Sequence, residues 1–345
     1  MNTDPASSAS ERTRGGLSDR GAGGALPSAA GTPAVVFENF RYRYPGTTRS
    51  QPGERELALD GVSLTVEAGD FVGVVGESGA GKSTLAQAVV GLVPHFYRGA
   101  VGGRVLVEGR DTQKATVAEL AQKVGLVFQN PFTQISGAKL TVFEEVASGL
   151  ENLGVPRDEM RRRVEDVLDT LGISYLARRD PFSLSGGEMQ RLAIACIMAL
   201  RPRIIVLDEP TSQLDPSGSA EVFAAVDTLR ERGVTIIMVE QKVEKLAAYS
   251  TKILLLWRGR VVDYGPPDKV FSRPDLSDYG VRRPVYTEAC RRLGVGRPDG
   301  SLPVTLEEAA SRLRAGLTAA ERAAGPTSGG HGTVPGPGPE GVERP

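Results

Sequence analysis

The sequence predicts an α/β fold with a parallel central sheet, and three observations support this class. Short runs rich in Val, Ile and Leu alternate with helical patterns along residues 34–257. Several of these runs are apolar at nearly every position, which is typical of strands buried on both faces of a sheet. One run leads directly into a glycine-rich turn and a helical pattern. Strands that alternate with helices indicate a sheet whose strands run parallel.

The periodicity of the apolar residues places each element in order. Ala34–Tyr44 alternates and carries aromatic side chains, so it is the first expected strand, and Thr47–Glu56 is expected to be a loop because it is polar and contains Pro and Gly. Further strands are expected at Val62–Val66, Phe71–Val75, Gly103–Val107, Val124–Phe128, Ile204–Leu207, Val234–Val239 and Ile253–Leu256. Helices are expected at Ser83–Leu92, Phe143–Glu151, Asp158–Leu171, Gly187–Leu200 and Ala220–Arg232.

Composition divides the chain into a main domain, an extension and two tails. Residues 1–33 and 321–345 are rich in small residues, Gly and Pro, and they lack an apolar period. Such segments bury too little apolar surface to offset the entropy of ordering them, so we expect both tails to be disordered. Residues 34–275 form the expected main domain, and residues 276–320 carry two helical patterns that predict a small C-terminal helical extension.

A helical subdomain is expected inside the main domain. The region from about residue 130 to residue 184 contains helical patterns and no good strand, although strands precede and follow it. The simplest interpretation is a helical unit inserted between two strands of the sheet.

Composition also excludes several classes of protein. The 345 residues carry 41 basic and 42 acidic side chains, a net charge of −1, which argues against a nucleic-acid binder because phosphate backbones demand a basic surface. No apolar run approaches the roughly 18 to 20 residues needed to cross a bilayer. The first thirty residues contain no hydrophobic block and do not resemble a signal peptide. Cys196 and Cys290 are far apart, so a disulfide framework is not expected and a reducing cytoplasm is.

The glycine-rich turn after Phe71–Val75 has the chemistry of a phosphate cradle. Its glycines let backbone N–H groups close around phosphate oxygens, and the N-terminus of the next helix adds positive partial charge. Lys82 supplies a charge to the β and γ phosphates, and the Ser83 hydroxyl can bind Mg²⁺. The match to the P-loop pattern predicts that this turn binds the phosphates of a nucleotide. The residues expected to bind it are Gly76, Glu77, Ser78, Gly79, Ala80, Gly81, Lys82, Ser83 and Thr84.

Two adjacent carboxylates follow an apolar strand. Asp208 is placed to hold Mg²⁺, and Glu209 is the candidate general base that polarises the attacking water. Acidic residues at the exposed end of a core strand are common. The pair therefore indicates a catalytic site mainly because the chain also contains the P-loop lysine, Lys82.

A second anion site is expected at the start of the helix near residue 187. Ser185, Gly186, Gly187 and Glu188 form a Ser-Gly-Gly turn that caps a helix. In such a turn the hydroxyl, the backbone amides and the helix dipole all favour an anion. A P-loop already provides the phosphate site for one ATP. A second phosphate site in the same chain therefore suggests that the two sites bind phosphates at different places.

With these motifs the chain resembles the ABC ATPase family over most of residues 35–275. The resemblance implies a P-loop NTPase cassette with a RecA-like mixed or parallel sheet core, an antiparallel β region and the inserted helical subdomain. It also implies that the Ser185 turn binds the γ-phosphate of ATP held by a partner subunit. Two cassettes would then act as a dimer, identical or diverged.

The resemblance implies roles for further positions. Gln129 corresponds to the Q-loop glutamine, which contacts Mg²⁺ and the attacking water, and Ser212–Asp215 corresponds to the D-loop that crosses the dimer interface. Tyr44 falls where the family stacks an aromatic ring on adenine. Tyr42 and Phe40 alternate with Tyr44 along the same strand, so a plain strand aromatic is an open alternative.

One position departs from the family. The family usually has a histidine after the strand that follows the Asp-Glu pair, where it hydrogen-bonds the γ-phosphate, whereas Gln241 stands here. The two histidines of the chain, His95 and His331, lie elsewhere in the sequence. A glutamine amide can donate a hydrogen bond to phosphate but cannot carry a positive charge. We therefore expect nucleotide binding to persist and turnover at this site to be slow.

Other segments resemble energy-coupling-factor (ECF) transporter ATPases. They are Gly91–Tyr97, Val127–Pro131, Val142–Val146, Glu151–Pro156 and Leu302–Ala309. This resemblance implies a peripheral subunit on the cytoplasmic face of the cell membrane that energises import of a vitamin or a transition-metal ion. Its implied partners are a second ATPase subunit, a transmembrane coupling protein and a membrane substrate-binding component, with no nucleic acid.

Two alternatives stay open from the sequence. One is the ATPase of another ABC importer or exporter, and the other is a non-transport regulatory ATPase. DNA-repair relatives are disfavoured because only about a hundred residues separate Lys82 from Ser185, with no heptad run between them.

Overall fold

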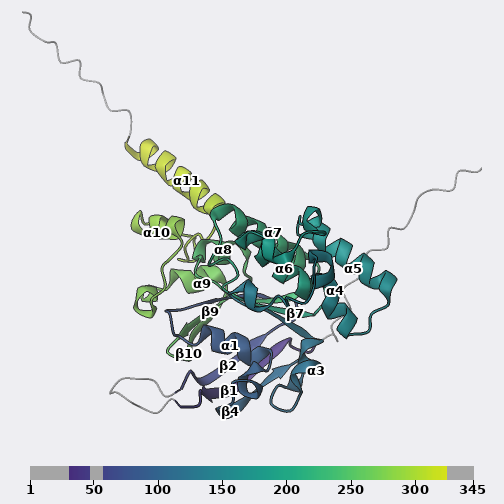
Figure 1. Cartoon of the computed structure of the whole chain (residues 1–345). Helices are drawn as coiled ribbons and strands as arrows, with labels where there is room; N and C mark the ends of the chain where they lie inside the picture. Colours follow the sequence, from purple (N-terminus) through teal and green to yellow (C-terminus); the bar gives the residue numbers. More distant parts are fainter. Residues whose placement is uncertain (1–30, 47–56, 325–345) are drawn as a thin grey trace, which may run out of the picture.

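The structure, a computed structural model, describes residues 31–46 and 57–324 (Figure 1). Two sheets form its centre. One has six strands in the order β10-β9-β3-β8-β7-β6, and the other has four in the order β2-β1-β4-β5. The strands are β1 (Val35–Arg43), β2 (Leu59–Val66), β3 (Phe71–Val75), β4 (Ala100–Val107), β5 (Arg110–Asp111), β6 (Val124–Val127), β7 (Ile204–Asp208), β8 (Thr235–Val239), β9 (Lys252–Trp257) and β10 (Arg260–Gly265).

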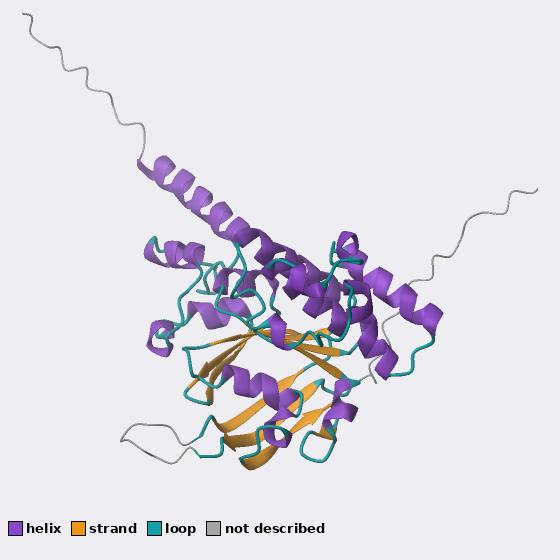
Figure 2. Ribbon diagram, viewed as in Figure 1, coloured by secondary structure: helices purple, strands orange, loops and turns teal. Residues whose placement is uncertain are grey.

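Helices cover the sheets, mostly on one side of the six-stranded sheet (Figure 2). They are α1 (Lys82–Val89), α2 (Leu92–His95), α3 (Val117–Ala121), α4 (Val142–Asn152), α5 (Arg157–Thr170), α6 (Gly186–Ala199), α7 (Pro216–Glu231), α8 (Val243–Tyr249), α9 (Pro267–Ser272), α10 (Val285–Arg292) and α11 (Leu306–Ala324). Short 3₁₀ turns lie at Pro131–Thr133, Ser174–Leu176, Pro181–Ser183 and Leu276–Tyr279. Within the described ranges, no helix combines the length and apolarity needed to cross a membrane.

The expected α/β class with a parallel central sheet is confirmed. β9, β3, β8, β7 and β6 pair in parallel, and only β10 runs antiparallel at one edge. The four-stranded sheet is antiparallel throughout, as the resemblance implied. The fold is therefore a mixed cassette in which a parallel core carries the ends of β3, β6, β7 and β8 to one edge.

The six-stranded sheet separates two apolar cores. On one face, Phe71 and Val75 of β3 pack with residues of α6, α7 and the helical region. On the other face, Val72 and Val74 pack with α1 and with the antiparallel sheet. Side chains alternate across a strand, so a strand buried on both faces must be apolar at every position, and all five residues of β3 are buried. This explains the continuous apolar runs in the sequence.

The chain between β6 and β7 is helical. Residues 128–203 are all described and contain α4, α5, α6 and 3₁₀ turns without a strand. α4 begins with a capping box in which the Thr141 side chain accepts from the Glu144 N–H, and the Glu144 carboxylate accepts from the Thr141 N–H. The boundaries of 130 and 184 for an inserted subdomain stay a prediction, because α6 packs both with α4 and with the sheet core.

Several short elements were not expected from the sequence. They are β5, β10, α2, α3, α8 and α9. β10 follows β9 through a two-residue turn in which Arg258 and Gly259 both have positive φ, 49° and 77°. Positive φ at both central residues is the geometry of a tight hairpin. The Arg-Gly pair after an apolar strand was thus a usable signal for β10.

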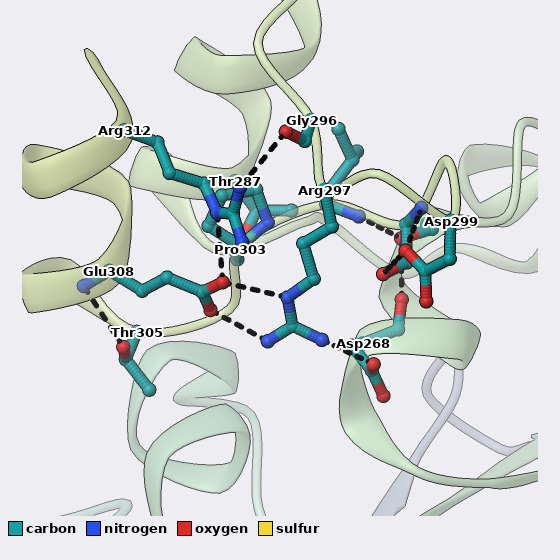
Figure 3. A network of polar contacts seen from close by, with 12 residues as sticks. Asp268, Thr287, Gly296, Arg297, Asp299, Pro303, Thr305, Glu308 and Arg312 are labelled. Carbon is teal, nitrogen blue, oxygen red and sulfur yellow. Dashed lines mark hydrogen bonds and ion pairs between the residues drawn. The ribbon is translucent and has the colours of Figure 1, made fainter. Parts of the chain in front are cut away.

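An ion pair of Arg297 links the predicted C-terminal extension to the predicted main domain, and further ion pairs lie within the extension (Figure 3). Arg297 binds both carboxylate oxygens of Glu308 on α11, at 2.7 and 2.6 Å, and also pairs with Asp268 of α9. Arg312 donates to Glu308 at 3.0 Å. α11 continues to Ala324, so residues 321–324 are helical although the sequence placed them in a disordered tail. The predicted loop Thr47–Glu56 and the remaining tail residues lie outside the described ranges.

Candidate active site at the carboxyl edge of the sheet

Four neighbouring parallel strands deliver the predicted site residues to one edge. Gly76 follows β3, Gln129 lies just beyond β6, Asp208 ends β7, and Gln241 lies just beyond β8. Carboxyl ends of parallel strands share an edge, and ligands of open α/β sheets bind there. The sheet order β3-β8-β7-β6 therefore explains how residues far apart in the sequence come together.

The turn between β3 and α1 requires glycine at two positions. A Cβ on Gly76 would lie 2.1 Å from the Leu256 carbonyl oxygen, and one on Gly81 would lie 2.5 Å from the Ala58 carbonyl oxygen. Gly81 also has a φ of 105°, which side chains rarely allow. Neighbouring backbone therefore packs closely against this turn at Gly76 and Gly81. Ser78 and Gly79, at the tip of the turn, are exposed.

Lys82 is folded back onto this turn. Its Nζ donates to the carbonyl oxygens of Gly76 at 3.0 Å and Glu77 at 2.9 Å. Burial lowers the pKa of the Lys82 ammonium, while the nearby carboxylates of Glu209 and Asp208 oppose that shift. The Lys82 ammonium therefore binds two backbone carbonyl oxygens. These contacts can be replaced by phosphate oxygens when a nucleotide binds.

Ser83 and Asp208 form a second contact of the site. The Ser83 hydroxyl donates to Asp208 Oδ1 at 3.2 Å. Burial raises the pKa of Asp208, and the hydrogen bond from Ser83 opposes this. The described ranges hold no cluster of three or more His, Cys, Asp or Glu residues that could enclose a metal. A hydroxyl beside one carboxylate fits Mg²⁺, which usually takes one or two carboxylates and completes its shell with phosphates and waters.

Glu209 is held between two glutamine amides. Gln129 Nε2 donates to one carboxylate oxygen at 2.9 Å, and Gln241 Nε2 donates to the other at 3.0 Å. The backbone of Glu209 has a φ of 49°, and its N–H donates to the Val239 carbonyl at 2.9 Å. A left-handed conformation is uncommon outside glycine and is found at functional sites. Of the three side chains predicted for catalysis, Glu209 therefore contacts both of the others.

Tyr44 lies beside the start of α1. Its hydroxyl is 3.1 Å from Thr84 Oγ1 and donates to Gln87 Oε1 at 3.0 Å. Its ring packs edge-on against Tyr42 and Tyr97, with centroids 4.8 and 5.9 Å away. Phe40 and Tyr42 are fully buried, whereas Tyr44 is half-buried. Tyr44 is therefore the only one of the three with an accessible ring, and its stacking on adenine stays a prediction.

The Ser185 turn caps α6 on the surface. Glu188 N–H donates to Ser185 Oγ at 3.4 Å, and Ser185 N–H donates to Glu188 Oε2 at 2.8 Å. That backbone hydrogen bond lowers the pKa of Glu188. A Cβ on Gly186 would meet no atom within 4 Å, so the turn is open to a ligand. In the described part of the chain, no hydrogen bond or ion pair joins residues 185–188 to the phosphate cradle.

The predicted D-loop leads into α7. Asp215 caps this helix, since its Oδ1 accepts from the Gly218 N–H at 2.7 Å. Leu214 lies near the Ser185 turn, 3.9 Å from the position of a Cβ on Gly187. The D-loop and the Ser185 turn therefore share one surface.

A buried polar cluster beside Gln241 was not anticipated from the sequence. Glu240 is 2% exposed and bonds to Thr211, and Lys242 reaches the Thr211 carbonyl and Ser219. The sequence does show an acidic residue, Glu240, directly after the apolar strand β8. An acidic side chain that is buried at such a position must have hydrogen-bond partners.

The chain shares sequence and structure with known proteins. A family model described as ABC transporter matches residues 59–212. The energy-coupling factor transporter ATP-binding protein EcfA1 of Enterococcus faecalis is 40% identical over 254 residues, 73% of this chain and 86% of that protein. The structure of cbiO1 from Clostridium perfringens, described as part of the ABC transporter complex cbiONQ, has a TM-score of 0.62 at 28% identity and covers 76% of this chain and 96% of that one. A dimeric ATP-binding cassette in a post-hydrolysis state, bound to ADP and Pi, has a TM-score of 0.57 at 28% identity and covers 68% and 98%.

Proposed function

This chain belongs to the family of ABC transporter ATP-binding proteins and is an ATPase subunit, and from that premise we propose that it energises an ECF-type importer of a small nutrient, in the vitamin or transition-metal-ion class. The convergence of Gln129 and Gln241 on Glu209 carries the catalytic part of the proposal. The similarity to EcfA1 and cbiO1 carries the importer part.

In the proposed reaction, Glu209 polarises the attacking water and accepts its proton. A carboxylate is a proton acceptor, and that is the group this step needs. Gln129 and Gln241 orient the carboxylate, and the amide of Gln241 also donates to the γ-phosphate. Lys82 and the N–H groups of the turn from Gly76 stabilise the phosphates. Ser83, Asp208 and Gln129 would hold Mg²⁺, which would supply positive charge to the phosphates.

The second half of the pocket is proposed to come from a partner cassette. The Ser185 turn presents a capped helix N-terminus on an open surface and makes no polar contact with its own phosphate cradle. A helix N-terminus favours anions, so this turn suits the γ-phosphate of ATP on another subunit. The D-loop residue Leu214 belongs to the same surface. Two cassettes, identical or diverged, would thus enclose two nucleotides.

Gln241 is expected to limit turnover. Replacing it with histidine, Gln241→His, should raise the ATPase rate of the assembled complex on the order of tenfold, because an imidazolium stabilises developing negative charge better than a neutral amide does. Steady-state phosphate release at saturating Mg-ATP measures this. Gln241→Asn keeps an amide and is the matched control. A rate for Gln241→His that is unchanged or reduced would show that this position does not limit hydrolysis.

We propose that the transmembrane partner binds exposed apolar side chains of the helical region that follows Gln129 in the chain. Leu140 is 83% exposed, and Phe132 and Phe182 are also exposed. Phe182 lies against Gly137, 3.4 Å from the position of a Cβ there, so segment 137–140 and Phe182 are continuous. Phe132, which is part of this set, lies three residues after Gln129 in the chain, so a bound helix of a membrane protein would act on the segment that carries Gln129. Binding there would keep the chain at the cytoplasmic face of the membrane.

Leu140→Glu tests the importer proposal. We expect it to reduce recovery of the chain with detergent-solubilised membranes about tenfold, since a charge replaces a central apolar contact. ATP binding by the purified chain should not change. Leu306→Glu at the start of α11, which is 60% exposed, is the matched control. Co-purification of the wild-type chain with a small integral-membrane substrate binder supports an ECF-type importer. Equal recovery of both variants contradicts the placement of the membrane partner on this surface. No membrane partner at all contradicts the importer proposal and favours a regulatory ATPase.

A further inference from the structure

Glu240 is one of few charged side chains that the described residues bury. The others below a tenth exposure are Lys82, which belongs to the phosphate cradle, and Glu145, which accepts from Ser136 N–H and Oγ. A carboxylate removed from water is costly unless hydrogen bonds satisfy its oxygens. Glu240 occupies the position directly before Gln241 and touches no part of the phosphate cradle through a hydrogen bond. Its burial therefore calls for an explanation other than nucleotide binding.

Both carboxylate oxygens of Glu240 are engaged. Oε1 accepts from the backbone N–H groups of Gln241 at 2.8 Å and Lys242 at 3.3 Å. Oε2 accepts from the Thr211 hydroxyl at 2.5 Å. The Glu240 carboxylate thus hydrogen-bonds both the backbone of Gln241 and the side chain of Thr211. Hydrogen bonds to an ionised acceptor are about twice as strong as neutral ones.

Thr211 belongs to the segment that connects Glu209 with the D-loop. It lies two residues after Glu209 and directly before Ser212. Its carbonyl oxygen also accepts from Lys242 Nζ at 3.1 Å, and Lys242 continues to Ser219 on α7. Residues 240 and 242 therefore hold the side chain and the carbonyl of the same threonine. The loop after β8 and the segment after β7 are cross-linked on both sides of Gln241.

We infer that Glu240 is a positioning residue for hydrolysis, which sets the Gln241 amide against Glu209 through its bond to Thr211. The D-loop begins at Ser212, so a displacement of this loop by a second cassette would pass through Thr211 and Glu240 to the backbone of Gln241. Glu240 itself does not contact the reacting atoms. The inference rests on the proposed role of Glu209 in ATP hydrolysis. It adds that Glu240 and Thr211 align the Gln241 amide with Glu209.

Thr211→Val is the sharpest test, because valine keeps the shape of threonine and removes the hydroxyl donor. We expect kcat for ATP to fall about tenfold while KM changes by less than about twofold, since the phosphate cradle is untouched. Thr211→Ser keeps the hydroxyl and should restore kcat to within about twofold of wild type. Thr112→Val is the matched control, because Thr112 is fully buried and its hydroxyl has no hydrogen-bond partner. It should leave kcat unchanged.

Glu240→Gln provides a second route if Thr211→Val does not fold. The amide oxygen of glutamine can still accept from the two backbone N–H groups, but the charged acceptor for Thr211 is lost, so kcat should fall by about threefold to tenfold at nearly constant KM. The double variant Thr211→Val with Glu240→Gln should lose no more than the larger single loss, because both remove one bond.

The outcomes separate this inference from the proposed function. A wild-type chain that does not hydrolyse ATP removes the proposed function itself. A wild-type chain that hydrolyses ATP, with Thr211→Val or Glu240→Gln at the wild-type kcat, overturns the inference and leaves the function intact. Additive losses in the double variant, or a failure of Thr211→Ser to restore kcat, likewise show that the two side chains do not act as one device.

Discussion

Glu209→Gln is expected to abolish steady-state ATP hydrolysis, lowering kcat at least about a hundredfold, while nucleotide binding persists. The substitution keeps the size of the side chain and removes its ability to accept a proton from water. It also removes one accepting oxygen. In the wild-type chain, both oxygens of Glu209 accept hydrogen bonds, one from Gln129 and one from Gln241. ATP should therefore stay bound without turnover, and the variant should accumulate as an ATP-bound pair of cassettes.

Two measurements check this expectation. Phosphate release at saturating Mg-ATP gives kcat, and size-exclusion chromatography in ATP gives the fraction of paired cassettes. Glu165→Gln on the exposed face of α5 is a matched control that changes the same charge far from the site. Hydrolysis by Glu209→Gln at the wild-type rate would exclude Glu209 as the base and would leave the two glutamine contacts without a catalytic explanation.

The strands of the parallel core could be predicted because buried strands impose a visible pattern. Phe71–Val75 is apolar throughout, and the structure places it in the middle of the sheet between β9 and β8. The residues that follow β3, β6, β7 and β8 could be expected at one edge, because parallel strands share their carboxyl ends. The contact of Glu209 with both Gln129 and Gln241 follows from that arrangement.

Other features could not be read from one sequence because they depend on distant partners. Glu240 looks like a solvated acid after a strand, and only the approach of Thr211 from the segment after β7 explains its burial. The helical residues 321–324 were assigned to a tail because the Gly-rich and Pro-rich composition begins at about that point, whereas α11 continues to Ala324. Short elements such as β5 and α3 lack the length that makes an apolar period visible.

The second large effect is expected at the Ser185 turn, where Ser185→Asp should separate ATP binding from hydrolysis. Aspartate is as good a helix cap as serine, so the bond from the Glu188 N–H and the folding of α6 should be kept. Its negative charge would face the γ-phosphate supplied by the partner cassette. Repulsion and the lost hydroxyl donor should together lower hydrolysis at least about a hundredfold.

The matched control for Ser185→Asp is Thr116→Asp, because Thr116 caps α3 in the same capping-box geometry, with Glu119 in the place of Glu188. Fluorescent-nucleotide titration should give both variants the wild-type affinity, since no hydrogen bond or ion pair of residues 185–188 or of Thr116 reaches the phosphate cradle among the described residues. Only Ser185→Asp should lose ATP-dependent pairing and turnover. If both variants hydrolyse ATP normally, the turn does not complete a neighbour's pocket. If Ser185→Asp instead weakens nucleotide binding by the isolated chain, the turn contacts the chain's own nucleotide, and a pocket shared between two cassettes is the wrong description.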